Sequence, residues 1–314
     1  MTQQTLERAP GTRPGRGRAP RRGLLTAAAA LAVAALLAGH RLVPGDAGTL
    51  LDTGLPWLGA AVPVLALAAA LRRAPLAGAA VAVAAAVWAA LFGTAFLPAS
   101  PSGGRYDLRA MSQNMYAANP VPARTAARLI ADRPDLLALQ EIRAGASTAR
   151  LDAAYPHRVV RGTVGLWSRL PITSSGPVDL GLGWPRALRA VVATGDGPLT
   201  VYVAHLGSAR PGDTGERDAT MDRLAARVRA DASGRVLLLG DLNTATTDRK
   251  LGALVPALRE AQGDAGSGLG FTWPSSFPLA RPDHILYRGL DPVDAATART
   301  PGSDHDAVRA DFRF

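Results

Sequence analysis

The sequence contains no cysteine and few aromatic residues, and these absences narrow the possible functions. Without cysteine, the 314-residue chain cannot form disulfide bonds, thiolate metal sites or a cysteine nucleophile. Only 5% of its residues are aromatic although 48% are hydrophobic, because alanine supplies much of the apolar content. A His-Glu-x-x-His zinc motif and a Gly-x-Ser-x-Gly nucleophile elbow are also absent. The chain is therefore neither a typical zinc peptidase nor a typical serine hydrolase.

The net charge of +10 is concentrated in the N-terminal tail. Residues 1–22 carry six arginines against one acidic residue, Glu7. Residues 104–314 carry 26 basic and 22 acidic residues, a net charge of only +4. A high overall isoelectric point is therefore weak evidence for nucleic-acid binding. The tail has no apolar periodicity, and we expect it to be disordered.

Three apolar runs, 24–39, 55–71 and 76–97, predict three membrane-spanning helices within residues 23–97. A soluble helical bundle would need polar faces at helical spacing, and no run has one. Arginines in the tail and in the turn 72–75 place both segments in the cytoplasm by the positive-inside rule. We therefore expect a cell-membrane protein with a short linker at 98–104 and an extracytoplasmic domain at 105–314. Arg21-Arg22 leaves open that the first span is a cleaved signal, which would not change this sidedness.

Four apolar segments of the C-terminal part end in polar side chains. The most marked is 236–239, which is followed by Gly240, Asp241, Leu242 and Asn243. Its four large apolar residues predict a strand buried on both faces, and the glycine predicts a turn after it. The segments 108–111, 136–139 and 201–204 run into Asn114, Glu141 and His205 in the same way. This pattern predicts one site at one edge of a sheet.

Predicted strands outnumber predicted helices after residue 105 and often follow one another directly. Helices are expected at 120–133, 213–232 and 248–259, and a hairpin is expected across 195–198. This order favours the α+β class, an α/β sandwich of two packed mixed β-sheets with helices outside, over a doubly wound parallel sheet.

The polar residues near the predicted strand ends suit a hard divalent cation. They comprise two histidines, four carboxylates and two amides, and no thiol: Asn114, Glu141, His205, Asp241, Asn243, Asp283, Asp304 and His305. Such donors favour Mg²⁺, with Mn²⁺ as an alternative, and Mg²⁺ sites commonly serve phosphoryl chemistry. Each residue alone could be a solvated strand end or a helix cap. Their joint occurrence favours a catalytic site.

These residues lie in an ordered set of motifs that resembles the endonuclease/exonuclease/phosphatase (DNase I-like) superfamily over residues 105–314. The motifs are Gln140-Glu141, Ser168-Arg169-Leu170-Pro171, His205, Gly240-Asp241-Leu242-Asn243, Arg281-Pro282-Asp283-His284-Ile285 and Ser303-Asp304-His305. The resemblance implies a four-layer fold and a metal-dependent phosphoric ester or anhydride hydrolase, that is, a phosphatase or phosphodiesterase.

The resemblance also implies roles for the individual residues. Glu141, Asn114 and Asp304 would bind the metal ion. His305 would be the general base, oriented by Asp283. The phosphate and the nucleophile would be held by Asp241, Asn243 and His205, with Asn114 also near the phosphate. Two positions depart from the family pattern: Tyr116, where some members have aspartate, and Pro282, which removes a strand hydrogen-bond donor.

The predicted membrane tether favours a lipid-linked phosphate ester or pyrophosphate at the outer face of the membrane as substrate. The chain further resembles actinomycete teicoplanin-resistance proteins of the VanJ type, which would imply a cell-envelope role in glycopeptide resistance. A tethered extracellular nuclease is the alternative, although few aromatic residues and a mild charge offer little grip on a nucleic-acid strand. An inactive envelope-binding module is a third hypothesis, which the presence of Glu141, Asp241 and His305 disfavours. No protein partner is predicted.

Overall fold

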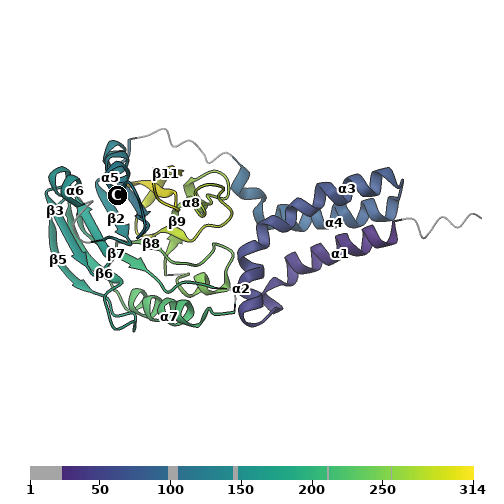
Figure 1. Cartoon of the computed structure of the whole chain (residues 1–314), viewed down its shortest axis with the longest axis horizontal. Coiled ribbons are helices and arrows are strands. Elements are labelled where there is room, and N and C mark those ends of the chain that lie inside the picture. The colour runs from purple at the N-terminus through teal and green to yellow at the C-terminus, as the bar shows by residue number, and fades with distance from the viewer. Residues whose placement is uncertain (1–22, 98–104, 144–147, 211, 256) are drawn as a thin grey trace, which may run out of the picture.

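The computed structural model describes residues 23–97, 105–143, 148–210, 212–255 and 257–314 (Figure 1). The predicted tail and linker, 1–22 and 98–104, lie outside the described residues. The described parts form an elongated bundle of apolar helices and a strand-rich C-terminal domain, residues 105–314.

The apolar bundle consists of three helices, with shorter helical segments at the end nearest the C-terminal domain. The elements are α1 (Leu24–Gly39), η1 (His40–Leu42), α2 (Gly45–Gly54), η2 (Leu55–Ala60), α3 (Ala61–Leu71), α4 (Pro75–Phe92) and η3 (Gly93–Phe96). Three continuous stretches, Leu24–Leu42, Gly45–Leu71 and Pro75–Phe96, are long and apolar enough to cross a membrane. The three predicted apolar runs are thus confirmed as candidate spans. The second stretch begins ten residues before the predicted start because α2 leads into it.

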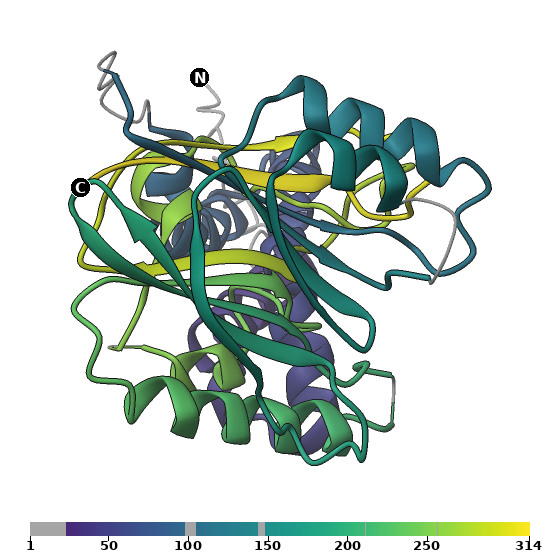
Figure 2. The same cartoon turned by 90° about the vertical axis from the view of Figure 1, so that its left-hand side faces the viewer.

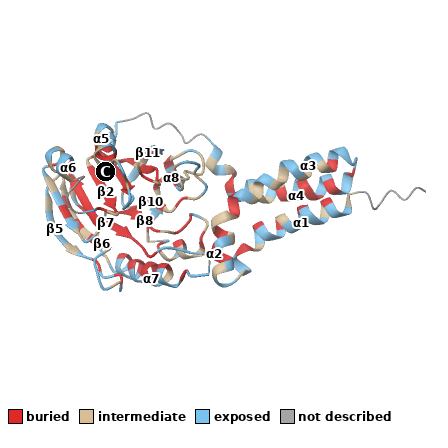
Figure 3. Cartoon of the chain, in the orientation of Figure 1, coloured by how far each residue is buried: buried red, intermediate tan, exposed pale blue. Residues whose placement is uncertain are grey.

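Much of the surface of the bundle is apolar and exposed (Figure 3). Leu25, Leu67, Leu71 and Leu76 are 89%, 61%, 76% and 68% exposed. Soluble domains rarely expose contiguous apolar surface on this scale, so these helices suit a lipid environment.

The two ends of the bundle differ in charge and in contacts. Gly23, which precedes α1, lies against Ala74, so the start of α1 and the turn between α3 and α4 share one end. Arg72 and Arg73 are exposed in that turn. The other end carries α2, which contacts the C-terminal domain (Figure 1). The basic turn with Arg72 and Arg73 therefore lies at the end of the bundle away from the C-terminal domain.

The C-terminal domain contains two six-stranded mixed sheets. The first has the order β11-β12-β1-β2-β4-β3 and the second β5-β6-β7-β8-β10-β9. The strands are β1 (Leu108–Asn114), β2 (Leu136–Gln140), β3 (His157–Arg161), β4 (Val164–Ser168), β5 (Ile172–Pro177), β6 (Ala187–Thr194), β7 (Gly197–His205), β8 (Val236–Asp241), β9 (Arg259–Glu260), β10 (Asp283–Arg288), β11 (Asp291–Ala298) and β12 (Ala307–Arg313). The helical segments are α5 (Pro122–Ala131), α6 (Thr148–Ala154), α7 (Gly215–Arg229), η4 (Arg249–Ala253) and α8 (Ala261–Ala265).

Alternating apolar residues explain how the sheets stack. In β8, Leu237 and Leu239 point into the core between the two sheets, whereas Val236 and Leu238 pack in the cluster that includes α7. In β1, Leu108 joins the central core, and the outer face of its sheet packs against α5 and α6. Both central strands are thus buried on two faces, as their apolar runs predicted. Figure 2 shows α7 and the pair α5 and α6 on opposite sides of the paired sheets. The predicted four-layer α/β sandwich is confirmed.

Two parallel strand pairs bring four strand ends together. β1 pairs in parallel with β2, and β7 pairs in parallel with β8, while the other strand pairs are antiparallel. The carboxyl ends of a parallel pair lie at the same edge of a sheet, and β1 contacts β8 across the core. The four ends therefore meet at one edge of the sandwich.

Some local predictions are wrong. The predicted helix 248–259 is only the short 3₁₀ segment η4, followed by turns and by β9. Asp248 caps η4 by accepting a hydrogen bond from Lys250 N, and the sequence after η4 contains a proline, which cannot continue a helix. The edge strands β3 and β11 were not predicted, because β3 is half exposed and alanine-rich β11 has a weak apolar alternation.

Candidate active site

Five of the polar residues predicted to form a site lie at the shared edge of the two sheets. Asn114 ends β1, His205 ends β7 and Asp241 ends β8, while Glu141 directly follows β2. Asp283 begins β10 directly opposite Asp241. The expected convergence of strand ends is therefore present in the structure, with the sheet register placing each side chain.

The backbone near the site adopts conformations that most residues avoid. Glu141, Asn243 and Tyr116 have positive φ values of 54°, 47° and 60°. Such left-handed conformations cost energy in non-glycine residues and often occur at functional sites. Gly240 has a different role from the predicted turn, because β8 continues through it to Asp241. A Cβ atom at Gly240 would collide with the carbonyl oxygen of Ala204, so glycine allows β7 and β8 to approach closely here.

Asn114 links two carboxylates of the site. Its Nδ2 donates hydrogen bonds to Glu141 Oε1 at 3.1 Å and to Asp241 Oδ2 at 2.9 Å. The other oxygen of Glu141 accepts a hydrogen bond from the backbone N of Ala117 at 2.7 Å. The Asn114 amide thus holds two negative groups close together, an arrangement that attracts a cation.

His305 and Asp283 form a buried hydrogen-bonded pair. His305 Nδ1 lies 2.8 Å from Asp283 Oδ2, which also accepts a 2.6 Å hydrogen bond from the Thr272 hydroxyl. Burial alone would lower the pKa of His305, but the adjacent Asp283 carboxylate, with Asp241 and Asp304, raises it to about 10. Nε2 of His305 is 3.9 Å from Asp241 Oδ2, so this nitrogen faces the carboxylate cluster.

His205 has the opposite electrostatic character. Its Nε2 lies 3.6 Å from Asp241 Oδ2 and 3.8 Å from Glu141 Oε1. Burial, with smaller contributions from Arg186 and His305, lowers the pKa of His205 to about 4 against the opposing effect of Asp241. His205 is therefore neutral at neutral pH and can donate one hydrogen bond without adding charge.

Asn243 is held beside Asp241. Its backbone N donates to Asp241 Oδ1 at 2.9 Å, and its side-chain Nδ2 donates to the carbonyl oxygen of Leu206 at 3.2 Å. Asn243, Asp241 and His205 therefore form one cluster at the ends of β7 and β8.

The donor set fits a divalent metal ion. Ligand atoms of Asp241, Asp283 and His305 all lie within 4.8 Å of one another, and all three residues are buried. Among the described residues, Asp283 Oδ1 has no hydrogen-bond partner although it is buried, which suits an atom that awaits a cation. Glu141 is linked to this group because Asn114 donates hydrogen bonds to both Glu141 and Asp241. Most of the donor atoms are oxygens, and oxygen donors favour a hard cation such as Mg²⁺.

The predicted ligand set of Glu141, Asn114 and Asp304 stays a prediction. Glu141 and Asn114 are in direct contact. Asp304 lies beside His305 and its charge helps to raise the pKa of that histidine, while its backbone carbonyl accepts a 2.7 Å hydrogen bond from Ser275 N.

Two buried polar residues that were not predicted hold His305 in place. Gln113 Nε2 donates to the Ser303 hydroxyl at 3.2 Å and to the carbonyl oxygen of His305 at 3.1 Å. The Ser303 hydroxyl accepts a 3.0 Å hydrogen bond from His305 N and donates to the carbonyl oxygen of Asn114 at 2.7 Å. The loop that carries His305 is thereby attached to the end of β1. The available signal for Gln113 was its position directly before Asn114 at the end of the predicted strand.

Arg186 is a further cation near the site that the sequence analysis missed. Burial lowers the pKa of Arg186, while Asp241, Glu216 and Glu141 act in the opposite direction, which places its guanidinium within electrostatic reach of the cluster. Its Nε is buried and has no hydrogen-bond partner among the described residues. An anionic group could supply that partner.

Three further polar residues of the domain have structural roles. His284 points away from the site, with Nε2 2.8 Å from the carbonyl oxygen of Thr244. Arg189 pairs with Asp231 at 2.7 Å. Ser168 stabilises the turn that follows β4 through hydrogen bonds with Leu170.

Comparison with proteins of known structure agrees with this architecture. Humanized TDP2 from D. rerio superposes with a TM-score of 0.56 at 18% identity, covering 66% of this chain and 99% of that one. An endonuclease/exonuclease/phosphatase from Beutenbergia cavernae gives a TM-score of 0.54 at 21% identity, covering 67% and 72%. Sphingomyelinase C from Streptomyces griseocarneus gives 0.51 at 17% identity, covering 65% and 98%. At these identities the likeness establishes the fold alone.

Sequence comparison gives the family. No curated protein matches the chain significantly. The family profile described as "Endonuclease/Exonuclease/phosphatase family" matches residues 111–305, well over half of the chain, and this range contains each residue placed at the site above. The chain belongs to the endonuclease/exonuclease/phosphatase family, whose members are metal-dependent phosphodiesterases and phosphatases.

Proposed function

We propose that the protein is a membrane-anchored, Mg²⁺-dependent phosphoesterase that hydrolyses a lipid-linked phosphate ester or pyrophosphate. The observation that carries this proposal is the position of the site relative to the apolar bundle. His305 and Asn243 border a cavity of about 320 Å³ that is also lined by Thr49 and Leu50 of α2, the helix that begins the second candidate span. A substrate in this site would lie next to the membrane anchor.

The side chains suit in-line attack of water on phosphorus. His305 Nε2 would accept the proton of the attacking water once a bound cation offsets the carboxylates that raise the pKa of His305. Asp283 holds Nδ1 and fixes the orientation of the ring. Asp241 and Asn243 would position the water and the phosphate. Neutral His205 would donate a hydrogen bond to a phosphoryl oxygen.

The metal site and one further cation complete the proposed arrangement. Glu141, Asn114 and Asp304 would hold Mg²⁺, or Mn²⁺. When bound, the cation would neutralise charge on the phosphoryl oxygens and on the carboxylates around His305. Arg186 would use its unpaired Nε to bind a phosphate oxygen.

The direction of the anchor supports an extracytoplasmic, cell-envelope role. The basic turn at Arg72 and Arg73 lies at the end of the bundle away from the C-terminal domain. If that turn is cytoplasmic, the site faces outward, where lipid-linked phosphates of wall synthesis are at hand. The resemblance to teicoplanin-resistance proteins of the VanJ type extends the proposal to glycopeptide resistance.

A nuclease is the second candidate. One structural neighbour, TDP2 from D. rerio, is complexed with a single-stranded DNA product, and another, NExo from Neisseria, is a 3′ phosphatase bound to a product DNA hairpin. Residues 104–314 have a small net charge and the chain has few aromatic residues, and both features argue against tight binding of nucleic acid.

Phosphate release by the full chain in vesicles decides between these candidates. We would compare polyprenyl pyrophosphate, phospholipid and plasmid DNA, each with Mg²⁺. Release from a lipid phosphate, lost in His305→Ala and kept in His157→Ala, is the expected result, because His157 lies on edge strand β3 outside the site. Nicked plasmid with intact lipid would instead identify a nuclease.

A further inference from the structure

Helix α2 connects the apolar bundle to the C-terminal domain. The second candidate span, Gly45–Leu71, has 27 residues, whereas about 20 are enough to cross a membrane. The excess falls within α2, which carries Asp46 and Asp52 and packs on the C-terminal domain (Figure 1). The helix can therefore lie at the water-facing end of the anchor.

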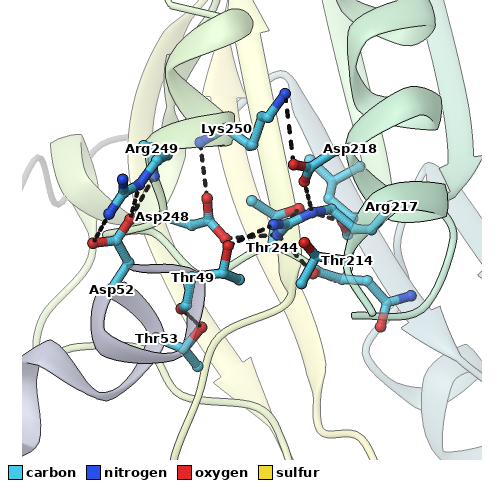
Figure 4. Close-up of polar contacts among 12 residues, drawn as sticks. Thr49, Asp52, Thr53, Thr214, Arg217, Asp218, Thr244, Asp248, Arg249 and Lys250 are labelled. Atoms are coloured by element: carbon cyan, nitrogen blue, oxygen red, sulfur yellow. Dashed lines mark hydrogen bonds and ion pairs between the residues drawn. The ribbon is translucent and has the colours of Figure 1, made fainter. Parts of the chain in front are cut away.

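A partly buried ion pair between Asp52 and Arg249 fixes α2 to the C-terminal domain. Asp52 is fully buried and accepts a 2.8 Å hydrogen bond from Arg249 Nε, and its other oxygen lies 2.6 Å from His40 Nδ1. Arg249, drawn with Asp52 in Figure 4, also donates to the carbonyl oxygens of Val43 at 2.7 Å and His40 at 3.0 Å. Breaking one partner of such a pair would leave a buried charge unpaired, so the geometry is strongly specified.

A second buried arginine connects α2 to the catalytic residues. Arg217 is fully buried and donates to Asp248 at 2.6 Å and to the carbonyl oxygen of Asn243 at 3.3 Å. The same guanidinium is 3.5 Å from the hydroxyl of Thr49 on α2 (Figure 4). One side chain thus holds both the segment after β8 and the neighbouring helix, so α2 has a defined position relative to Asn243.

The cavity between α2 and the site has two chemically different ends. His305 and Asn243 provide the polar end. Leu50 of α2 and Trp273, which are 63% and 45% exposed, give the cavity an accessible apolar surface, to which Ala245, Ala280 and Pro282 add. Polar side chains, among them Asp46 and Arg210, complete the lining. A volume of about 320 Å³ lies at the lower end of the range for small-molecule sites. It can hold a phosphate group and the first carbons of an attached chain.

We propose that α2 forms one wall of the substrate pocket, where Leu50 and Trp273 contact the apolar chain next to the phosphate of a membrane amphiphile. This inference rests on the proposed function and adds that the anchor itself recognises the substrate. The occupant would be an apolar chain, because Leu50 and Trp273 present exposed apolar surface to the cavity and because α2 is continuous with the candidate span.

The absence of cysteine makes a direct test simple. A single Leu50→Cys substitution gives the full chain one thiol, and Asp283→Asn in the same chain slows turnover without changing side-chain size. The rate of maleimide labelling is measured in detergent with Mg²⁺, with polyprenyl pyrophosphate, inorganic pyrophosphate or a short DNA oligonucleotide as probe. Leu42→Cys is the matched control, because Leu42 is 86% exposed and does not line the cavity.

Polyprenyl pyrophosphate should slow labelling of Leu50→Cys about tenfold at about ten times its Kd, since only the free fraction reacts, and should leave Leu42→Cys unchanged. Equal protection by inorganic pyrophosphate would show that the pocket holds only phosphate and would overturn the inference. Protection by the oligonucleotide but not by polyprenyl pyrophosphate would show that α2 contacts nucleic acid, and this result would also overturn the inference.

Turnover by the wild-type chain separates this inference from the proposed function. If the wild-type chain releases phosphate from polyprenyl pyrophosphate but this lipid does not protect Leu50→Cys, then α2 does not contact the substrate. The proposed function would still hold. Protection of Leu50→Cys by a lipid that the wild-type chain does not hydrolyse would support the wall and refute the proposed function.

Discussion

The sharpest mechanistic prediction concerns the pair of His305 and Asp283. Asp283→Asn keeps the size of the side chain but removes the negative charge 2.8 Å from His305 Nδ1. Although burial lowers the pKa of His305, Asp283 is the largest of the groups that raise it. Removing this carboxylate must therefore lower the pKa of His305, so that the histidine loses its proton at a lower pH than in the wild type.

Two changes in kinetics should follow. General-base catalysis typically contributes about 10²–10⁴ in rate, so His305→Ala should lose a factor in this range. Asp283→Asn should lose less, because the base remains but is less basic and less well oriented. In a pH profile of kcat/KM, the limb that reports deprotonation of the base should move to lower pH in Asp283→Asn.

The assay is phosphate release across the pH range at saturating Mg²⁺. Asp264→Asn is the matched control, because its carboxylate pairs with Arg259 and Tyr287 outside the site, and its profile should equal that of the wild type. An unchanged limb with an unchanged rate in Asp283→Asn would refute the reasoning, as would a limb that moves to higher pH.

Three further predictions concern the metal, the phosphate and stability. Glu141→Gln should raise the Mg²⁺ concentration for half-maximal activity at least about tenfold, and an unchanged metal titration would contradict its role. Arg186→Gln should raise KM about tenfold or more with a smaller effect on kcat, since a charge-assisted hydrogen bond to the substrate is lost. Burial opposes ionisation of Glu260, but Arg281 and His284 lower its pKa to about 2 from 4.5. The ionised Glu260 carboxylate therefore stabilises the fold above pH 4.5, and this stabilisation is lost as the pH falls toward 2. In urea unfolding of the detergent-solubilised protein, Glu260→Gln should lower the midpoint at neutral pH but lower it much less near pH 2.

The central strands and the site could be predicted because their signals are local. The run 236–239 is apolar at every position, which is typical of a strand buried on both faces, and Asp241 then marks its end. Convergence of Asn114, Glu141, His205 and Asp241 followed from the parallel pairing of strands that end in this way.

The remaining contacts depend on residues far apart in the sequence. Asp52 and Arg249 are separated by 197 positions, and neither carries a local sign that it meets the other. Arg217 looks like an ordinary surface residue of an amphipathic helix, yet it is fully buried because Asp248 and α2 cover it. Arg186 precedes a strand in a loop without a motif, so only the fold places it near the carboxylates.

The central claim is that the polar cluster hydrolyses a lipid-linked phosphate with the aid of a divalent metal ion. Inorganic phosphate released from polyprenyl pyrophosphate by the full chain in vesicles tests it most directly, with EDTA added and Mg²⁺ then restored. We predict release that stops with EDTA, resumes with Mg²⁺ and is absent in His305→Ala. Release that continues in EDTA, or equal release by His305→Ala, would contradict the account.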